Sequence, residues 1–207
     1  MLVSLPYESV LLLACSDGKQ GKTVSLQGRV EAIPESRGAH YHPGAIYVPY
    51  KHSVYVFGGS TLECEAYLPK DWSWLGLPCL SASRVYSTPC LHRGFIYICG
   101  GFCLSLDIFC PETLTFLPTP SLSLPEFSCE TLSLSINDWI LIISENCTCC
   151  YHPAANMLES VCNLGLSPWS LPKNYVVVGT WLYFEVPGGG VASGDVMTGD
   201  YRRLKGY

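Results

Sequence analysis

Five apolar hexamers recur along the chain at a nearly constant spacing, and this periodicity limits the possible folds more than any other feature. They begin at positions 10, 54, 96, 140 and 182, so successive hexamers start 44, 42, 44 and 42 residues apart. Their sequences are VLLLAC, VYVFGG, IYICGG, ILIISE and LYFEVP. A period of this length is typical of repeated supersecondary units. We therefore expect a single domain over residues 1–207 with five units, at 1–36, 37–80, 81–122, 123–168 and 169–207.

The hexamers and their flanking residues predict a β-hairpin in most units. Each hexamer opens with about four consecutive apolar residues rich in Val, Ile, Tyr and Phe, which is typical of a strand covered on both faces. A turn signal precedes four of them, as KHS, HRG, IND and GT. A second strand-like run lies upstream of each turn, as GAIYVPY, RVYSTPCL, ETLSLS and NYVVV. Two such runs joined by a short turn predict a hairpin.

A second hairpin is expected downstream, because pairs of large apolar residues recur there with six residues between them. The pairs are Tyr67 with Trp74, Phe109 with Phe116, Tyr151 with Leu158, Leu26 with Ile33, and Met197 with Leu204. Turn sequences such as LPKD, CPET, HPAA and TGD separate the members of these pairs. Four short strands in about 43 residues predict the blade of an all-β propeller, with the aromatic residues filling the wedges between blades.

Two consecutive glycines end the second and third hexamers, as Gly58 with Gly59 and Gly100 with Gly101. Glycine adopts positive φ without a Cβ clash, and it lets another backbone approach closely. We therefore expect positive φ or a close backbone contact at one or both positions of each pair.

The sequence contains an apolar run that is followed by a double glycine, a Tyr, six further residues and a Trp. This order of features resembles the kelch repeat. The two best copies are SVYVFGGSTLECEAYLPKDWSWLGLP and RVYSTPCLHRGFIYICGGFCLSLDIFCPETLTFLP, which together cover about residues 37 to 120. The motif residues are Gly58, Gly59, Tyr67, Trp74, Gly100, Gly101, Phe109 and Phe116. Arg84, twelve residues before Ile96, stands where kelch blades often place an Arg. The resemblance implies a kelch-type propeller of four-stranded antiparallel blades.

The other three units keep the period but lose the glycines. Their hexamers end in AC, SE and VP, and Gly188 to Gly190 follow the last of them. Propellers of the kelch family usually have six or seven blades. Five units could close as a small ring, could be part of a larger propeller, or could complete a ring with another chain. An open end would expose an unpaired blade face that favours self-association.

Charge and composition exclude some classes of partner. The net charge is −5 and no run of Lys or Arg is present, so we expect no binding to nucleic acid or to a membrane surface. Twelve cysteines are a large number for this length. LLAC at Cys15 resembles a lipoprotein cleavage site only loosely, because no positive charge precedes it. We expect a cytoplasmic protein whose cysteines are reduced thiols that fill apolar space.

Catalytic and metal sites have little support in the sequence, so we expect neither an enzyme nor a bound cofactor. ENCTCCYH carries Cys147, Cys149, Cys150 and His152, which are ligands suited to zinc or copper. No second ligand pair accompanies them, and we expect inert packing. In a strand, Cys147 and Cys149 face one side and Cys150 the other.

A binding module is the preferred interpretation, in which loops and inner-strand ends meet a protein or peptide at the mouth of the central channel. The residues that we expect near this mouth are Arg37, His40, His42, Arg84, Tyr86, Lys173 and Asn174. Arg suits bidentate capture of an acidic peptide. Kelch proteins often act in ubiquitin-ligase complexes or as cytoskeletal scaffolds, with an additional domain that this sequence does not show. The alternative is a propeller enzyme, or a protein that binds a small sugar-like ligand in the same channel.

Overall fold

The structure is a computed structural model that describes residues 2–5, 9–12, 22–25, 30–34, 44–58, 60–85, 87–101, 103, 105–118, 131–144, 147–160, 175–185 and 190–204. These residues form twenty strands in five four-stranded antiparallel sheets. None of them forms a helix that is long and apolar enough to cross a membrane. The architecture is all-β and propeller-like.

The strands of each sheet follow one another in the chain. The first sheet contains β1 (Leu2–Leu5), β2 (Ser9–Leu12), β3 (Lys22–Ser25) and β4 (Val30–Ala32). The second contains β5 (Ile46–Tyr50), β6 (Ser53–Phe57), β7 (Cys64–Leu68) and β8 (Ser73–Leu77). The third contains β9 (Cys90–His92), β10 (Phe95–Cys99), β11 (Leu106–Cys110) and β12 (Thr115–Phe116).

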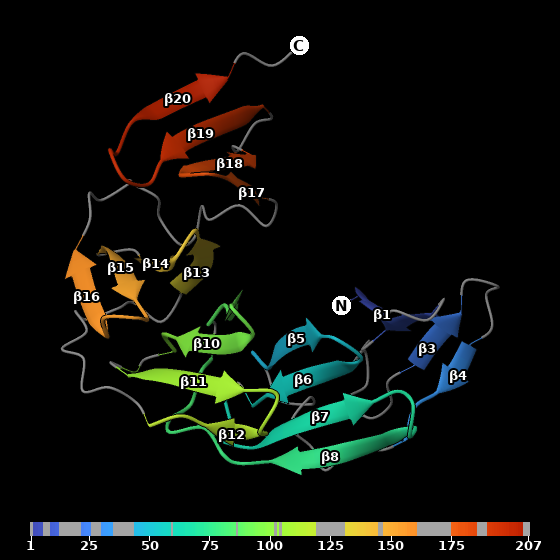
Figure 1. The fold of residues 1–207 in the computed structure, drawn as a ribbon. Helices are drawn as coiled ribbons and strands as arrows, with labels where there is room; N and C mark the ends of the chain where they lie inside the picture. The colour runs from blue at the N-terminus through green and yellow to red at the C-terminus, as the bar shows by residue number, and fades with distance from the viewer. Residues whose placement is uncertain are drawn as a thin grey trace.

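The fourth sheet contains β13 (Thr131–Ile136), β14 (Trp139–Ser144), β15 (Thr148–His152) and β16 (Met157–Ser160). The fifth contains β17 (Tyr175–Val178), β18 (Trp181–Glu185), β19 (Val191–Asp195) and β20 (Tyr201–Leu204). The sheets stand in an arc with the first strand of each sheet toward its centre (Figure 1). The first and fifth sheets lie on the two sides of the opening of this arc (Figure 1).

Short loops of recurring geometry join the strands. The first hairpins of the second to fifth sheets have two-residue loops, and their first residues all adopt positive φ: Lys51, Arg93, Asn137 and Gly179. Positive φ at this point suits the right-handed twist of the paired strands. In the second hairpins of the second to fourth sheets, the last of four loop residues has positive φ: Trp72, Leu114 and Asn156. Both expected sets of turns are confirmed.

The register explains the spacing of the paired large residues. Tyr67 lies opposite Trp74, and Phe109 lies opposite Phe116, each across the second hairpin of its sheet. Tyr151 faces Leu158 in the same way. The rings of the first two pairs are in contact, with centroids 5.2 and 5.1 Å apart. All six side chains pack between neighbouring sheets, as expected.

Two details of the sequence interpretation are wrong. In the fifth sheet Leu204 lies opposite Val191, and the register position of an aromatic pair belongs to Gly194 and Tyr201. The apolar pattern is misleading there because glycine occupies the inner position. In the third sheet β9 is much shorter than RVYSTPCL, because Pro89 has no N–H to donate to a ladder. Leu26 lies outside the described residues.

Alternate residues of the second strand cover opposite neighbours. We call the face toward the preceding sheet the leading face and the face toward the following sheet the trailing face. The first and third hexamer residues lie on leading faces: Val54 and Val56, Ile96 and Ile98, Ile140 and Ile142, Leu182 and Phe184. The second and fourth lie on trailing faces: Tyr55 and Phe57, Tyr97 and Cys99, Leu141 and Ile143. All fourteen side chains are buried.

Candidate functional site

Arg84 lies inside the protein, where it forms a polar clamp within the third repeat. Its side chain is completely buried and forms an ion pair with Asp107 on β11. Nε and Nη2 donate to Asp107 Oδ2 at 2.9 and 2.7 Å. Nη1 donates to the carbonyl oxygens of Gly100 and Ser105 at 2.9 and 2.7 Å, and Nη2 also reaches the Ser105 hydroxyl at 2.8 Å. The expectation that Arg84 meets a partner at the channel mouth is therefore wrong, because its donors are used internally.

The glycines at the end of β10 allow this clamp and the next sheet to come close. Gly100 and Gly101 both have positive φ, at 93° and 76°. A Cβ on Gly100 would lie 2.7 Å from Thr131 Cγ2 on β13, and a Cβ on Gly101 would lie 2.7 Å from the backbone carbon of Arg84. Thr131 also donates its hydroxyl proton to the Cys99 carbonyl at 2.7 Å. Positive φ and close approach are thus both confirmed here.

At Gly58 the structure confirms the expected close backbone contact but not a positive φ. Its Cβ would lie 2.6 Å from the Glu63 carbonyl oxygen and 2.8 Å from Thr61 Cγ2, within the turn that follows β6. Gly59 lies outside the described residues. Gly58 therefore serves a tight turn in the second sheet, whereas Gly100 serves a contact between sheets in the third.

The cysteine cluster on β15 is divided between two interfaces, as the strand alternation predicts. Cys149 packs between the third and fourth sheets with Cys147 beside it, and Cys150 packs between the fourth and fifth. Burial raises the pKa of Cys149 to about 12 and that of Cys150 to about 11. His152 lies against the Trp139 ring, with centroids 4.7 Å apart. In the described part of the chain, no three His, Cys, Asp or Glu side chains are placed to hold a metal ion.

The described cysteines are free thiols, which agrees with their expected use as apolar filler. Six of the nine are buried: Cys64, Cys90, Cys99, Cys110, Cys149 and Cys150. Burial raises the pKa of Cys64, Cys90 and Cys99 to about 12, so these thiols are strongly disfavoured as nucleophiles. The Thr113 hydroxyl lowers the pKa of Cys110 instead.

Arg37, His40, His42, Tyr86, Lys173 and Asn174, which we also expected at the channel mouth, lie outside the described residues. Their role stays a prediction. The described structure instead draws attention to a surface that the sequence analysis did not single out.

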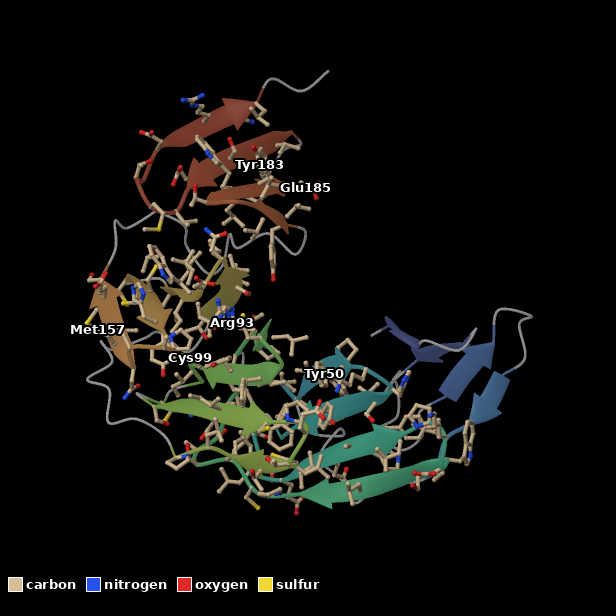
Figure 2. All side chains as sticks on the ribbon, viewed as in Figure 1. Tyr50, Arg93, Cys99, Met157, Tyr183 and Glu185 are labelled. Atoms are coloured by element: carbon tan, nitrogen blue, oxygen red, sulfur yellow. The ribbon has the colours of Figure 1, made fainter. Side chains whose placement is uncertain are left out.

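The trailing face of the fifth sheet exposes several large apolar side chains. The strand register assigns to it Val176, Val178, Trp181, Tyr183, Glu185, Val191, Ser193, Asp195, Arg202 and Leu204. Figure 2 labels Tyr183 and Glu185 in this sheet. Val176 is 61% exposed and Val178 59% exposed, although both are large aliphatic side chains in a strand.

The corresponding face of the fourth sheet shows what this surface lacks. Leu134 and Ile136 hold the register positions of Val176 and Val178, and each is only 3% exposed. The fifth sheet covers them with Leu182, Phe184 and Ala192. The same kind of face is therefore covered by a sheet in one case and faces the opening of the arc in the other.

Charged groups border this apolar surface. The Arg202 guanidinium lies over the Trp181 ring, 5.4 Å from its centroid. Asp195 accepts hydrogen bonds from the Thr180 hydroxyl at 3.1 Å and from the Met197 amide at 2.9 Å. An apolar centre with a polar border is the usual composition of a protein-binding surface. The sequence signal was the run YVVV, which we interpreted only as a strand.

Comparisons with known proteins support the fold but assign no family. No family model and no curated protein sequence matches the chain. Among solved structures, that of YjhT is similar with a TM-score of 0.60 and 14% sequence identity. The match covers 84% of this chain and 67% of the YjhT chain. At this identity the likeness concerns the fold alone.

Proposed function

We propose that the five sheets are blades of a kelch-type β-propeller and that the protein is a non-catalytic protein–protein interaction module. The kelch assignment rests on the aromatic pairs across the second hairpins, on the double glycines with close contacts, and on the buried Arg84–Asp107 pair. The free thiols suit a reducing compartment, and we propose a cytoplasmic location.

The exposed trailing face of the fifth sheet is the observation that carries the interaction role. Monomeric soluble proteins seldom leave a contiguous apolar sheet face exposed, and larger exposed apolar patches mark interaction sites. Burying a side chain of the size of Val contributes about 1.5 to 3 kcal/mol. Covering Val176, Val178 and their neighbours would therefore supply much of the free energy of a stable complex. Partners that are polypeptides fit this surface, whereas nucleic acid does not, because its apolar centre offers no row of cations.

Site-specific photo-crosslinking in the cells of origin tests this function. A photoreactive amino acid at position 176 should crosslink to a polypeptide. The matched control carries the same group at Met157, which is 46% exposed on the outer strand of the fourth sheet (Figure 2). Position 157 should yield no specific adduct, because no such face surrounds it. Equal adducts at both positions, or none at position 176, would reject the interaction role.

A further inference from the structure

We propose that Cys147 and Cys149 are a reversible oxidation site, at which hydrogen peroxide converts the two thiols into a disulfide. The site lies at the start of β15 in the fourth sheet. It goes beyond the proposed interaction role and does not depend on it. The sequence pattern favours inert packing for this group of cysteines, but the structure separates Cys147 from the others.

Accessibility distinguishes Cys147 from the two cysteines that follow it. Cys149 and Cys150 are 1% and 2% exposed, whereas Cys147 is only half-buried. Cys147 directly precedes β15 and packs at the border of the apolar cluster that contains Cys149. A reagent from solvent therefore reaches Cys147 first.

Two contacts of the Cys147 sulfur suit this chemistry. The Ser144 hydroxyl lies 3.3 Å from Cys147 Sγ, where it can donate a hydrogen bond to the sulfur. The Ser144 amide donates to the Cys147 carbonyl at 2.9 Å, which holds Cys147 beside this hydroxyl. The second contact is Cys149, whose thiol is hydrogen-bonded to the Cys147 thiol. The half-buried sulfur thus has a hydroxyl donor on one side and a second thiol on the other.

The backbone separation of the two cysteines permits a bridge. Residues two apart in a strand point to the same face, and at the ordinary rise their Cα atoms are about 6.6 Å apart. Disulfides usually join Cα atoms about 4.4 to 6.8 Å apart, so this pair is close to the upper limit. Cys150 packs on the other face, between the fourth and fifth sheets. A bridge that is partly exposed and close to the geometric limit is easily reduced again, as a reversible site requires.

The reaction balances in two steps. The Cys147 thiolate attacks one oxygen of hydrogen peroxide, the O–O bond breaks, and Cys147 becomes a sulfenic acid while hydroxide leaves and takes a proton from solvent. The Cys149 sulfur then attacks the Cys147 sulfur, the S–O bond breaks, and the hydroxyl group leaves with the Cys149 proton as water. The two thiols lose two electrons, which reduce one peroxide to two waters.

Burial decides which cysteine takes which part. Burial and, after it, the neighbouring Cys147 thiol raise the pKa of Cys149 to about 12, so Cys149 keeps its proton at neutral pH. The first step requires a thiolate and access to peroxide, and it therefore falls to Cys147. Cys149 suits the second step, because its proton is the one that the leaving hydroxyl group needs.

Peptide mapping by mass spectrometry tests the inference on the full chain. The folded reduced protein is treated with a small molar excess of hydrogen peroxide, the remaining thiols are alkylated in denaturant, and the chain is cleaved after glutamate. Cleavage after Glu145 and Glu159 releases NCTCCYHPAANMLE, which contains Cys147, Cys149 and Cys150. We expect this peptide to lose two hydrogen atoms through the bridge and to carry one alkyl group, on Cys150. Reduction before alkylation should restore alkylation of all three cysteines.

Serine variants assign the two parts. Cys147→Ser should abolish the bridge and leave Cys149 reduced. Cys149→Ser should leave a sulfenic acid on Cys147, which dimedone traps as a stable adduct. Cys150→Ser is the matched control, because Cys150 is as deeply buried on the same strand, and this variant should form the bridge as the wild type does.

The map of the wild type decides the inference even if a variant fails to fold. Alkylation of all three cysteines after peroxide treatment would show inert packing and would overturn the proposal. A bridge from Cys149 to Cys150 or to Cys99, which lies near Cys149 across the sheet interface, would overturn it as well. Oxidation of Cys147 to a sulfinic acid with Cys149 still reduced would also do so, because Cys149 would then not complete the second step.

Discussion

The third and fifth sheets have the same strand order but differ in how many neighbours they have. The third sheet is covered on both faces, and its backbone approaches the fourth so closely that Gly100 has no room for a Cβ. Among the described residues, the fourth sheet covers the leading face of the fifth sheet, and the trailing face exposes Val176 and Val178. The comparison teaches that a covered interface limits residue size and admits charges only where they are paired, as Arg84 and Asp107 are, whereas an exposed face imposes neither limit.

The largest predicted effect concerns the polar clamp of the third sheet. Arg84→Ala should lower the free energy of unfolding by about 3 to 5 kcal/mol, because it leaves Asp107 buried without its partner. Urea denaturation followed by tryptophan fluorescence measures this change. In the fifth sheet, Arg202→Ala should cost less than about 1 kcal/mol, because Arg202 is exposed and only its contact with Trp181 is lost.

A double variant separates the ion pair from the space that it fills. Arg84→Met with Asp107→Leu removes both charges and keeps apolar volume in the site. It should be more stable than Arg84→Ala, because no charge is then buried alone. If Arg84→Ala lowered the free energy of unfolding by less than about 1 kcal/mol, Asp107 would have to bind water or another partner in the variant. The polar clamp would then not be needed for the stability of the third repeat.

The next effect compares equivalent trailing residues of two sheets. Leu134→Ala should lower the free energy of unfolding by about 2 to 4 kcal/mol, because it removes a buried side chain and leaves a cavity against the fifth sheet. Val176→Ala at the equivalent position should cost less than about 0.5 kcal/mol in the single chain, because Val176 is already exposed. The free energy of unfolding should be measured by urea denaturation at low protein concentration, so that the chain is not associated. A large loss for Val176→Ala under these conditions would show that the fifth sheet is covered within one chain.

Two glycines with positive φ provide a smaller contrast. Gly100→Ala should cost about 2 to 3 kcal/mol, because it combines unfavourable φ with overlap against Thr131. Gly179→Ala should cost about 1 kcal/mol, because φ is also positive there but no atom lies within 4 Å of the added Cβ. Thermal unfolding of the two variants gives the comparison. Equal losses would mean that the third and fourth sheets separate easily and that close packing does not require Gly100.

The repeat, the strand order and the aromatic wedges could be predicted from the sequence because each has a local pattern. Spacing alone placed Tyr67 opposite Trp74, and turn chemistry located the hairpins. Arg84 was misplaced because nothing local distinguishes an Arg at a channel mouth from one buried against a carboxylate 23 residues further along the chain. Burial of this kind depends on Asp107, Gly100 and Ser105 coming together in three dimensions.

The open face of the fifth sheet could not be predicted for a different reason. An apolar strand has the same sequence pattern whether or not a neighbour covers it, so YVVV in β17 does not differ from TLSLSI in β13 in a way that reports exposure. Only the arrangement of the sheets shows that Val178 is exposed and Ile136 is not. The sequence likewise does not show that Glu185 lies on this face, because that placement depends on the strand register.

The smallest effect uses the pH dependence of stability at the trailing face of the third sheet. Burial raises the pKa of the Cys99 thiol from 9.0 to about 12, so the folded protein keeps a proton that the unfolded chain releases above pH 9. The contribution of Cys99 is therefore fully present below pH 9 and is lost as the pH rises toward 12, by at most about 1.4 kcal/mol per pH unit. Cys99→Val should reduce the decline in unfolding free energy between pH 9 and pH 10, as measured by urea denaturation.

Ile98→Val on the same strand should lower stability equally at both pH values, because it removes a methyl group and no titrating group. The described fifth sheet contains no cysteine, so changes such as Ala192→Gly should likewise shift stability without altering its pH dependence. If Cys99→Val kept the full decline, Cys99 would have to be ionised or solvated in the folded state, and the third and fourth sheets would be less tightly closed than their packing indicates.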